Sequence, residues 1–101
     1  YFDAAQIEHP IRVRGFNPGD RFQPFGLSGS QKLKKLFIDR KIPAPLRLHW
    51  PIIECNGKIL WVVGLRRSDY APISNTTTEV IRLELIGRVP WPPYASDLPD
   101  I

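Results

Sequence analysis

The chain has 101 residues, a hydrophobic content of 43% and a formal net charge of +4, values that fit one folded domain and exclude wholesale disorder. No apolar run is long enough to span a membrane and Cys55 is the single cysteine, which excludes a transmembrane helix, an intrachain disulfide and a cysteine-rich metal site. The lack of methionine and the start at Tyr1 predict that the chain is part of a longer protein.

The first thirty residues predict two short strands and a long loop. Residues 1–7 begin with apolar side chains and are expected to form a strand that leads into a turn, which Pro10 ends. Residues 11–14, IRVR, alternate with the period of a half-buried strand, so Arg12 and Arg14 are expected on its exposed face. Residues 15–29 are rich in Gly and Pro and predict a loop with a turn at 17–20.

A helix is predicted from about Gln31 to Arg40, with Ser28 or Ser30 as its N-cap. The prolines of the following IPAP segment are expected to end it. Helical spacing places three apolar side chains on one face and three lysines on the opposite arc; the apolar set is Leu33, Leu36 and Phe37, and the basic set is Lys32, Lys34 and Lys35.

The second half predicts antiparallel strands. Two apolar runs between residues 48 and 66 are joined at Asn56-Gly57, the strongest short hairpin signal in a sequence. Residues 79–87 alternate as a last strand, and the proline-rich tail 88–101 is expected to be irregular. The fold class predicted is therefore α+β, mainly antiparallel with one main helix, in a domain over residues 1–87.

No recognised catalytic, nucleotide-binding or metal-binding motif is present. His9 and His49 lie far apart without a second ligand nearby, and no nucleophile signature surrounds Cys55 or the serines. The GLSGSQK segment departs from a phosphate-binding loop because Lys32 does not follow a glycine and Leu33 replaces the hydroxyl residue. We therefore predict no catalytic, cofactor-binding or metal-binding residue in this chain.

Basic residues are concentrated in the first half of the sequence. Nine cations lie between Arg12 and Arg47 against two carboxylates, Asp20 and Asp39, whereas the remainder is net acidic. Such a segment is either a solvated surface or a surface that contacts phosphate and sugar, as in the recognition of RNA by shape. The convergence of a basic strand, a basic helix and a glycine-rich loop favours the phosphate contact.

Several motifs follow one another in a distinctive order between residues 11 and about 68. They are an R-x-R strand, a P-G-D-R-F turn, K-L-K-K before a helix end, I-P followed by Arg, and W-V-x-G-x-R. In this order they resemble the C-terminal domain of bacterial tRNA(Ile)-lysidine synthase. The resemblance implies a sandwich-like α+β fold similar to a module of the phenylalanyl-tRNA synthetase β subunit.

The resemblance also implies a function. The parent enzyme would be cytoplasmic and would use ATP to attach lysine to the wobble cytidine of the tRNA(Ile) anticodon. ATP and Mg²⁺ would bind in its N-terminal catalytic domain. This chain would be a non-catalytic accessory domain whose partners are tRNA(Ile) and that catalytic domain. The alternative is a structural or protein-interaction module without RNA contact, which would dock or dimerise through the Leu-Trp-Val-rich hairpin.

The resemblance implies a set of basic residues as tRNA contacts: Arg12, Arg14, Arg21, Lys32, Lys34, Lys35, Arg47 and Arg66. Asp20 is expected to fix the turn or to orient Arg21. Trp61 and Val62 are expected in the core, and burial of Trp50 is favoured over stacking on a base.

Overall fold

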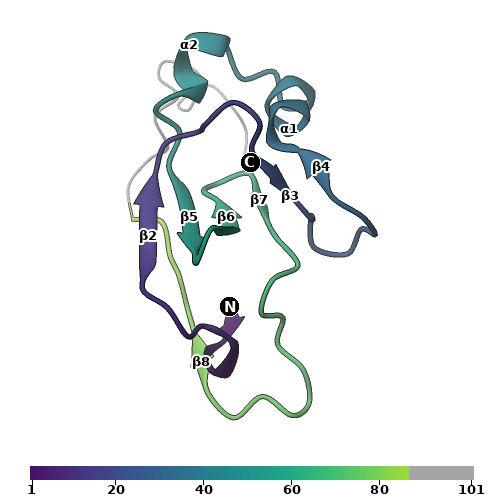
Figure 1. The fold of residues 1–101 in the computed structure, drawn as a ribbon, viewed down its shortest axis with the longest axis vertical. Helices are drawn as coiled ribbons and strands as arrows, with labels where there is room; N and C mark the ends of the chain where they lie inside the picture. Colours follow the sequence, from purple (N-terminus) through teal and green to yellow (C-terminus); the bar gives the residue numbers. More distant parts are fainter. Residues whose placement is uncertain (87–101) are drawn as a thin grey trace.

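A computed structural model describes residues 1–86 of the chain, so the proline-rich tail predicted at 88–101 lies outside the described residues. Figure 1 shows the two helices at one end of the molecule and the pair of β1 and β8 at the other. The described part is a small α+β unit of mainly antiparallel sheets with one main helix, which confirms the predicted class. In this part no helix has the length and apolarity needed to cross a membrane.

Four antiparallel strands form the central sheet. They are β2 (Ile11–Arg14), β5 (Ile52–Cys55), β6 (Lys58–Val62) and β7 (Arg66–Arg67), in the order β2-β5-β6-β7. Asn56 and Gly57 connect β5 to β6 with φ values of 51° and 77°, as a two-residue hairpin requires, so the predicted hairpin is confirmed. Strand β7 was not predicted because its two residues carry no alternating pattern.

A bulge in β6 sets which residues of this strand face each of the two apolar clusters. Ile53 pairs with Trp61 whereas Glu54 pairs with Ile59, which leaves Leu60 as the extra residue. The bulge therefore allows Ile59 and Val62, three positions apart, to join the same core cluster, while Leu60 joins the cluster on the opposite side.

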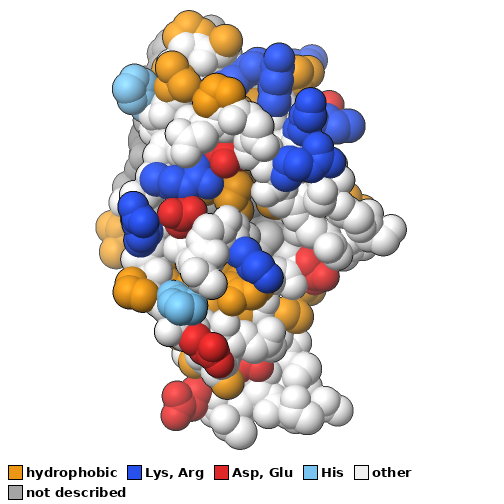
Figure 2. All heavy atoms as spheres, in the orientation of Figure 1, with side chains coloured by type: hydrophobic (Ala, Val, Ile, Leu, Met, Phe, Trp, Pro, Cys, Tyr) orange, Lys and Arg blue, Asp and Glu red, His pale blue; other side chains and the backbone are white. Residues whose placement is uncertain are grey.

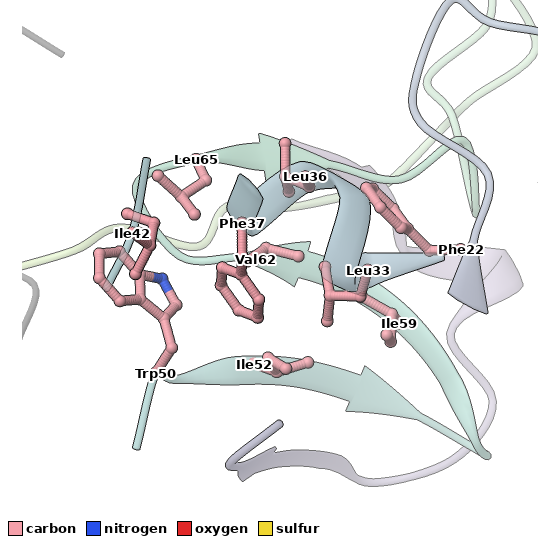
Figure 3. Packing of buried hydrophobic residues seen from close by; sticks show 10 residues of the cluster. All are labelled: Phe22, Leu33, Leu36, Phe37, Ile42, Trp50, Ile52, Ile59, Val62 and Leu65. Carbon is pink, nitrogen blue, oxygen red and sulfur yellow. The ribbon is translucent and has the colours of Figure 1, made fainter. Parts of the chain in front are cut away.

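The larger core lies between the sheet and α1 (Leu33–Asp39). Figure 3 shows Leu33 and Phe37 of this helix pointing toward side chains from β5 and β6, with Trp50 beside Phe37, and Leu36 belongs to the same cluster. All three helix residues are buried, as predicted from helical spacing. The indole of Trp50 is fully buried and its Nε1 donates to the carbonyl oxygen of Val63 over 2.9 Å. The expected burial of Trp50 is thus confirmed.

A smaller core joins the two ends of the described chain. β1 (Phe2–Asp3) leads into a short 3-10 helix, η1 (Ala4–Gln6), and pairs with β8 (Val80–Ile81). Phe2, Leu60 and Cys55 are buried here, with Trp61 packed against them. The prediction of an N-terminal strand is confirmed. The last strand is only two residues long because its partner, β1, also has only two residues.

The start of the helix differs from the prediction. Gln31–Lys32 form strand β4, which pairs with β3 (Arg21–Phe22), so the helix begins at Leu33 instead of Gln31. Neither Ser28 nor Ser30 is the N-cap; Lys32 occupies that position without a side-chain hydrogen bond. The backbone N–H of Leu33 donates instead to the carbonyl oxygen of Asp20, a contact across the hairpin that residue propensity does not reveal.

A second, one-turn helix follows where only a helix-breaking segment was predicted. α1 ends at Asp39, and Lys41 takes a left-handed backbone with φ of 58°. α2 (Ala44–Arg47) then begins, with Pro43 at its N-cap and a proline in its first turn. Proline is accepted there because the N–H groups of a first turn have no partner within the helix.

Candidate nucleic-acid interface

The structure separates the eight predicted contact residues by exposure. The exposed residues are Arg12, Arg21, Lys32, Lys34 and Lys35, and the half-buried ones are Arg14, Arg47 and Arg66. Figure 2 shows Lys and Arg side chains gathered over α1 and the β3–β4 hairpin, whereas the lower third of this face carries Asp and Glu. The charge asymmetry of the sequence is therefore also an asymmetry between the two ends of the molecule.

A groove lies between the β2–β3 loop, the start of α1 and α2. Its volume is about 380 Å³, and its cationic lining residues are Lys32, Lys34 and Arg47. Phe16, Pro18 and Leu48 contribute apolar surface to the same groove. We call it the cationic groove. It brings together three of the predicted contacts, which come from β4, α1 and α2.

Local packing holds the walls of the cationic groove in place. The ring of Phe16 meets that of Phe37 edge-on, with centroids 5.2 Å apart, which fixes the loop to the core. Gly15 lies so close to α2 that an added Cβ would stand 2.3 Å from the carbonyl oxygen of Leu48. Arg47 is steadied by a 3.0 Å hydrogen bond from its Nε to the carbonyl oxygen of Ile42.

Arg14 is half-buried in an ion network, so its expected exposure on β2 is wrong. Its Nη1 and Nη2 donate to the two carboxylate oxygens of Asp20 at 2.9 and 3.1 Å, and its Nε donates to Glu54 at 3.0 Å. The side chains of Arg14, Asp20 and Glu54 are 20%, 13% and 10% exposed. The hydrogen bond with Asp20, above all, raises the pKa of Arg14.

The same network explains the role of Asp20. Its carboxylate also accepts a hydrogen bond from the backbone N–H of Asn17 at 2.8 Å, which closes the turn and confirms that part of the prediction. Its cationic partner is Arg14 rather than Arg21, whose Nε donates to the hydroxyl of Ser30. Because Arg14 offsets Asp20, the one carboxylate that lines the cationic groove does not cancel the charge of its lysines.

The β3–β4 hairpin extends the cationic surface away from the groove. Arg21 and Lys32 are directly opposite each other in the register of these strands, and both are exposed. Two like charges in this position destabilise a strand pair. Lys35 lies on α1 and is paired with Asp39 at 2.9 Å, with both side chains more than half exposed.

The remaining two predicted contacts lie elsewhere. Arg12 lines a hollow with His9 and Glu54 beside the β5–β6 turn. Arg66 lies near the turn between β6 and β7, where its Nη2 donates to the carbonyl oxygen of Phe25 at 2.7 Å. The structure therefore does not unite all eight residues in one surface.

Sequence reasoning missed the apolar part of the cationic groove. Leu48 lines it because α2 turns the chain toward the β2–β3 loop, and no local signal predicted α2. Phe16 was recognisable as an aromatic residue within the Gly- and Pro-rich loop, which is the one available signal. Within residues 1–86, no group of three or more His, Cys, Asp or Glu side chains is placed to hold a metal ion.

Comparisons with known proteins find relatives that are named tRNA(Ile)-lysidine synthase. A tRNA(Ile)-lysidine synthase of Caldanaerobacter subterraneus subsp. tengcongensis is 39% identical over 84 residues, which are 83% of this chain and 18% of that protein. The tRNA(Ile)-lysidine synthase of Geobacillus kaustophilus is 46% identical over 69 residues, 67% of this chain and 15% of that protein. The chain thus spans about a fifth of the length of the curated relatives that it matches.

A solved structure and a family profile agree with these relatives. The crystal structure of a TILS C-terminal domain superposes with a TM-score of 0.66 at 44% identity, and the match covers 71% of this chain and 56% of that one. The profile of the TilS substrate C-terminal domain matches residues 11–85, which include the central sheet, α1 and the cationic groove. The chain therefore belongs to the TilS substrate C-terminal domain family.

Proposed function

We propose that this chain is the tRNA-binding accessory domain of a tRNA(Ile)-lysidine synthase. The observation that carries the proposal is the cationic groove together with the β3–β4 hairpin, a surface whose lysines and arginines are not offset by nearby carboxylates. The parent enzyme would attach lysine to the wobble cytidine of tRNA(Ile) with ATP in the cytoplasm. ATP and Mg²⁺ would bind in its N-terminal catalytic domain, the second partner of this chain.

The charge distribution supports a phosphate-rich partner. Of the two carboxylates between Arg12 and Arg47, Asp20 is paired with Arg14 and Asp39 with Lys35. The facing cations Arg21 and Lys32 repel each other, and an anion held between them would remove that cost. A contact of this kind reads the phosphate backbone and the shape of RNA rather than its sequence.

We assign the proposed contacts by their surroundings. Residues on the groove, the hairpin and the exposed surfaces of α1 and β2 would contact phosphate directly; they are Arg12, Arg21, Lys32, Lys34, Lys35 and Arg47. Arg14 would support the groove through Asp20 instead of touching RNA. The sandwich-like similarity to a phenylalanyl-tRNA synthetase module belongs to this proposal as well.

The alternative, a docking module, requires an exposed apolar surface on the β5–β6 hairpin, and this surface is mostly buried. It relied on the apolar hairpin, but Leu60 and Val62 are fully buried in the two cores of the chain itself. Trp61 is half-buried and packs against the smaller core. The hairpin therefore offers little apolar area to a partner, whereas the cationic groove and the β3–β4 hairpin remain exposed.

The test is a salt series of tRNA binding by the 101-residue chain and by Lys32→Gln/Lys34→Gln. Loss of two phosphate contacts is expected to lower the slope of log affinity against log salt by about 1.5. The control is Lys58→Gln/Arg82→Gln, which removes the same charge outside the groove and should lower the slope by less than half as much. Equal slopes for the two double variants, with melting temperatures unchanged, would refute the assignment of the groove.

A further inference from the structure

A second arginine-rich hollow lies at the β7 edge of the central sheet. Its volume is about 470 Å³, and Arg40, Arg66 and Arg67 line it together with Phe25 and Trp61. No carboxylate lines this hollow among the described residues. Arg40 and Arg67 were not among the predicted contacts, because they meet only when α1 and β7 are brought together. We call this hollow the arginine pocket.

Backbone carbonyl groups hold the guanidinium groups of the arginine pocket. Arg40 Nη2 donates to the carbonyl oxygen of Leu65 at 3.0 Å, and Arg66 Nη2 donates to that of Phe25 at 2.7 Å. Each spends one N–H donor in this way and makes no other hydrogen bond within residues 1–86, so most of its donors remain available. A carbonyl oxygen is neutral, and these contacts therefore orient the cations without cancelling their charge.

Arg67 is held more firmly than its neighbours. Its guanidinium carbon lies 4.3 Å from the ring centroid of Phe2 and 4.7 Å from that of Phe25, and Nε and Nη2 donate to the carbonyl oxygens of Ser68 and Tyr70. Burial lowers the pKa of Arg67, although the nearby charge of Asp69 acts in the opposite direction. Such a cation gains from an anion brought close to it.

We propose that the arginine pocket binds a phosphate group of the RNA backbone, as a site separate from the cationic groove. Planar guanidinium forks match the oxygens of a phosphate in two-point hydrogen bonds, and side chains that are already held lose little entropy on binding. Arg40 and Arg66 keep donors for such bonds, whereas Arg67, whose Nε, Nη1 and Nη2 already donate to carbonyl oxygens, contributes its charge to the wall of the hollow. The identity of the ligand rests on the proposed function, whereas the presence of an oxyanion site rests on the pocket itself.

The two sites lie at opposite ends of the main helix. Lys32 and Lys34 are at the start of α1, and Arg40 directly follows its last residue, Asp39. At about 1.5 Å per residue this is a separation of roughly 10 Å along the helix axis. At about 3.4 Å per nucleotide in a duplex strand, a separation of this size corresponds to about three nucleotides. The separation along the helix axis is therefore within the reach of one RNA strand.

The first experiment measures tRNA binding over a salt series for Arg40→Gln and Arg66→Gln. Each variant is expected to lower the log-log slope by about 1 and the affinity severalfold at the lowest salt. Arg82→Gln is the control because it removes one exposed arginine, 60% accessible, that does not line the arginine pocket. Arg67 is left unchanged because it fixes Phe2 to the core. Slopes no lower than that of Arg82→Gln in both variants would overturn the proposal.

A second experiment separates this proposal from the proposed function. Inorganic pyrophosphate is titrated into the 101-residue chain while the side-chain N–H resonances of its arginines are followed by NMR. Saturable shifts of Arg40 and Arg66, lost in the respective Gln variants, are expected even if tRNA does not bind. If tRNA binds through the cationic groove but pyrophosphate leaves both resonances unshifted, the proposal that the arginine pocket binds phosphate is wrong and the proposed function stands.

Discussion

Replacement of Arg14 by Met should destabilise this fold more than any exposed ion pair could. The variant leaves the carboxylates of Asp20 and Glu54, 13% and 10% exposed, without their shared cation. Breaking a fully buried pair in this way costs about 3–5 kcal/mol. Asp20 keeps its hydrogen bond from Asn17, so we expect a loss of about 3 kcal/mol, equivalent to a fall in melting temperature of roughly 15 °C for a domain of this size.

The assay is urea and thermal unfolding of a double-mutant cycle with Arg14→Met and Glu54→Gln. Neutralising Glu54 removes part of the charge left behind by Arg14→Met, so the double variant should be at least 1 kcal/mol more stable than the sum of the single losses predicts. The reference is Arg82→Met, which breaks the exposed pair with Glu84 and should cost less than about 0.5 kcal/mol.

Two results would refute this reasoning. One is an Arg14→Met loss no greater than that of Arg82→Met, and the other is a coupling energy with Glu54 indistinguishable from zero. The same protein also tests the supporting role given to Arg14 in RNA binding. Below its melting transition, Arg14→Met should weaken tRNA binding, because it leaves the carboxylate of Asp20 in the cationic groove without its cation. The loss should be smaller than that of Lys32→Gln/Lys34→Gln, because Arg14 makes no direct phosphate contact in this assignment.

Two further variants test local features of the fold. Gly15→Ala should cost about 3 kcal/mol in unfolding free energy because its Cβ would meet the carbonyl oxygen of Leu48. Gly26→Ala is the control: its Cβ would lie in open space, so only the φ of 84° opposes it and the cost should be about 1 kcal/mol. Equal losses in the two variants would contradict the close approach of Gly15 to Leu48. Hydrogen bonds from Gln6, first, and from the N–H of Ala5 lower the pKa of Asp3, so its stabilisation is complete above pH about 4 and is lost as the pH falls. Asp3→Asn should therefore show a smaller fall in melting temperature between pH 5 and pH 3 than the parent chain, and parallel curves would count against this role.

Features that depend on neighbouring residues were predictable. Asn56-Gly57 specified the hairpin because two successive left-handed residues suit few other structures. The spacing of Leu33, Leu36 and Phe37 specified the buried face of the helix, since helical geometry alone places them together. The ordered motifs between residues 11 and about 68 likewise indicated the family that the profile over residues 11–85 shows.

Features that depend on distant partners were not predictable. Ser28 and Ser30 have the right chemistry for a helix cap, but pairing of β3 with β4 moved the start of the helix to Leu33. The alternation of IRVR placed Arg14 on an exposed face, but Asp20 and Glu54 enclose it. In each case a local preference of about 1 kcal/mol or less gave way to hydrogen bonds made across the fold.

The sequence by itself determined the class of the fold, its family and the concentration of cations between Arg12 and Arg47, since these depend on local pattern, motif order and composition. Only the tertiary structure decided how those cations are grouped. It places Lys32, Lys34 and Arg47 around one groove, commits Arg14 to an internal network, and brings Arg40 to Arg66 and Arg67 at the far end of α1. The reason is physical: the field of a charged group depends on distance in space and on nearby counter-charges, and neither is encoded in sequence separation.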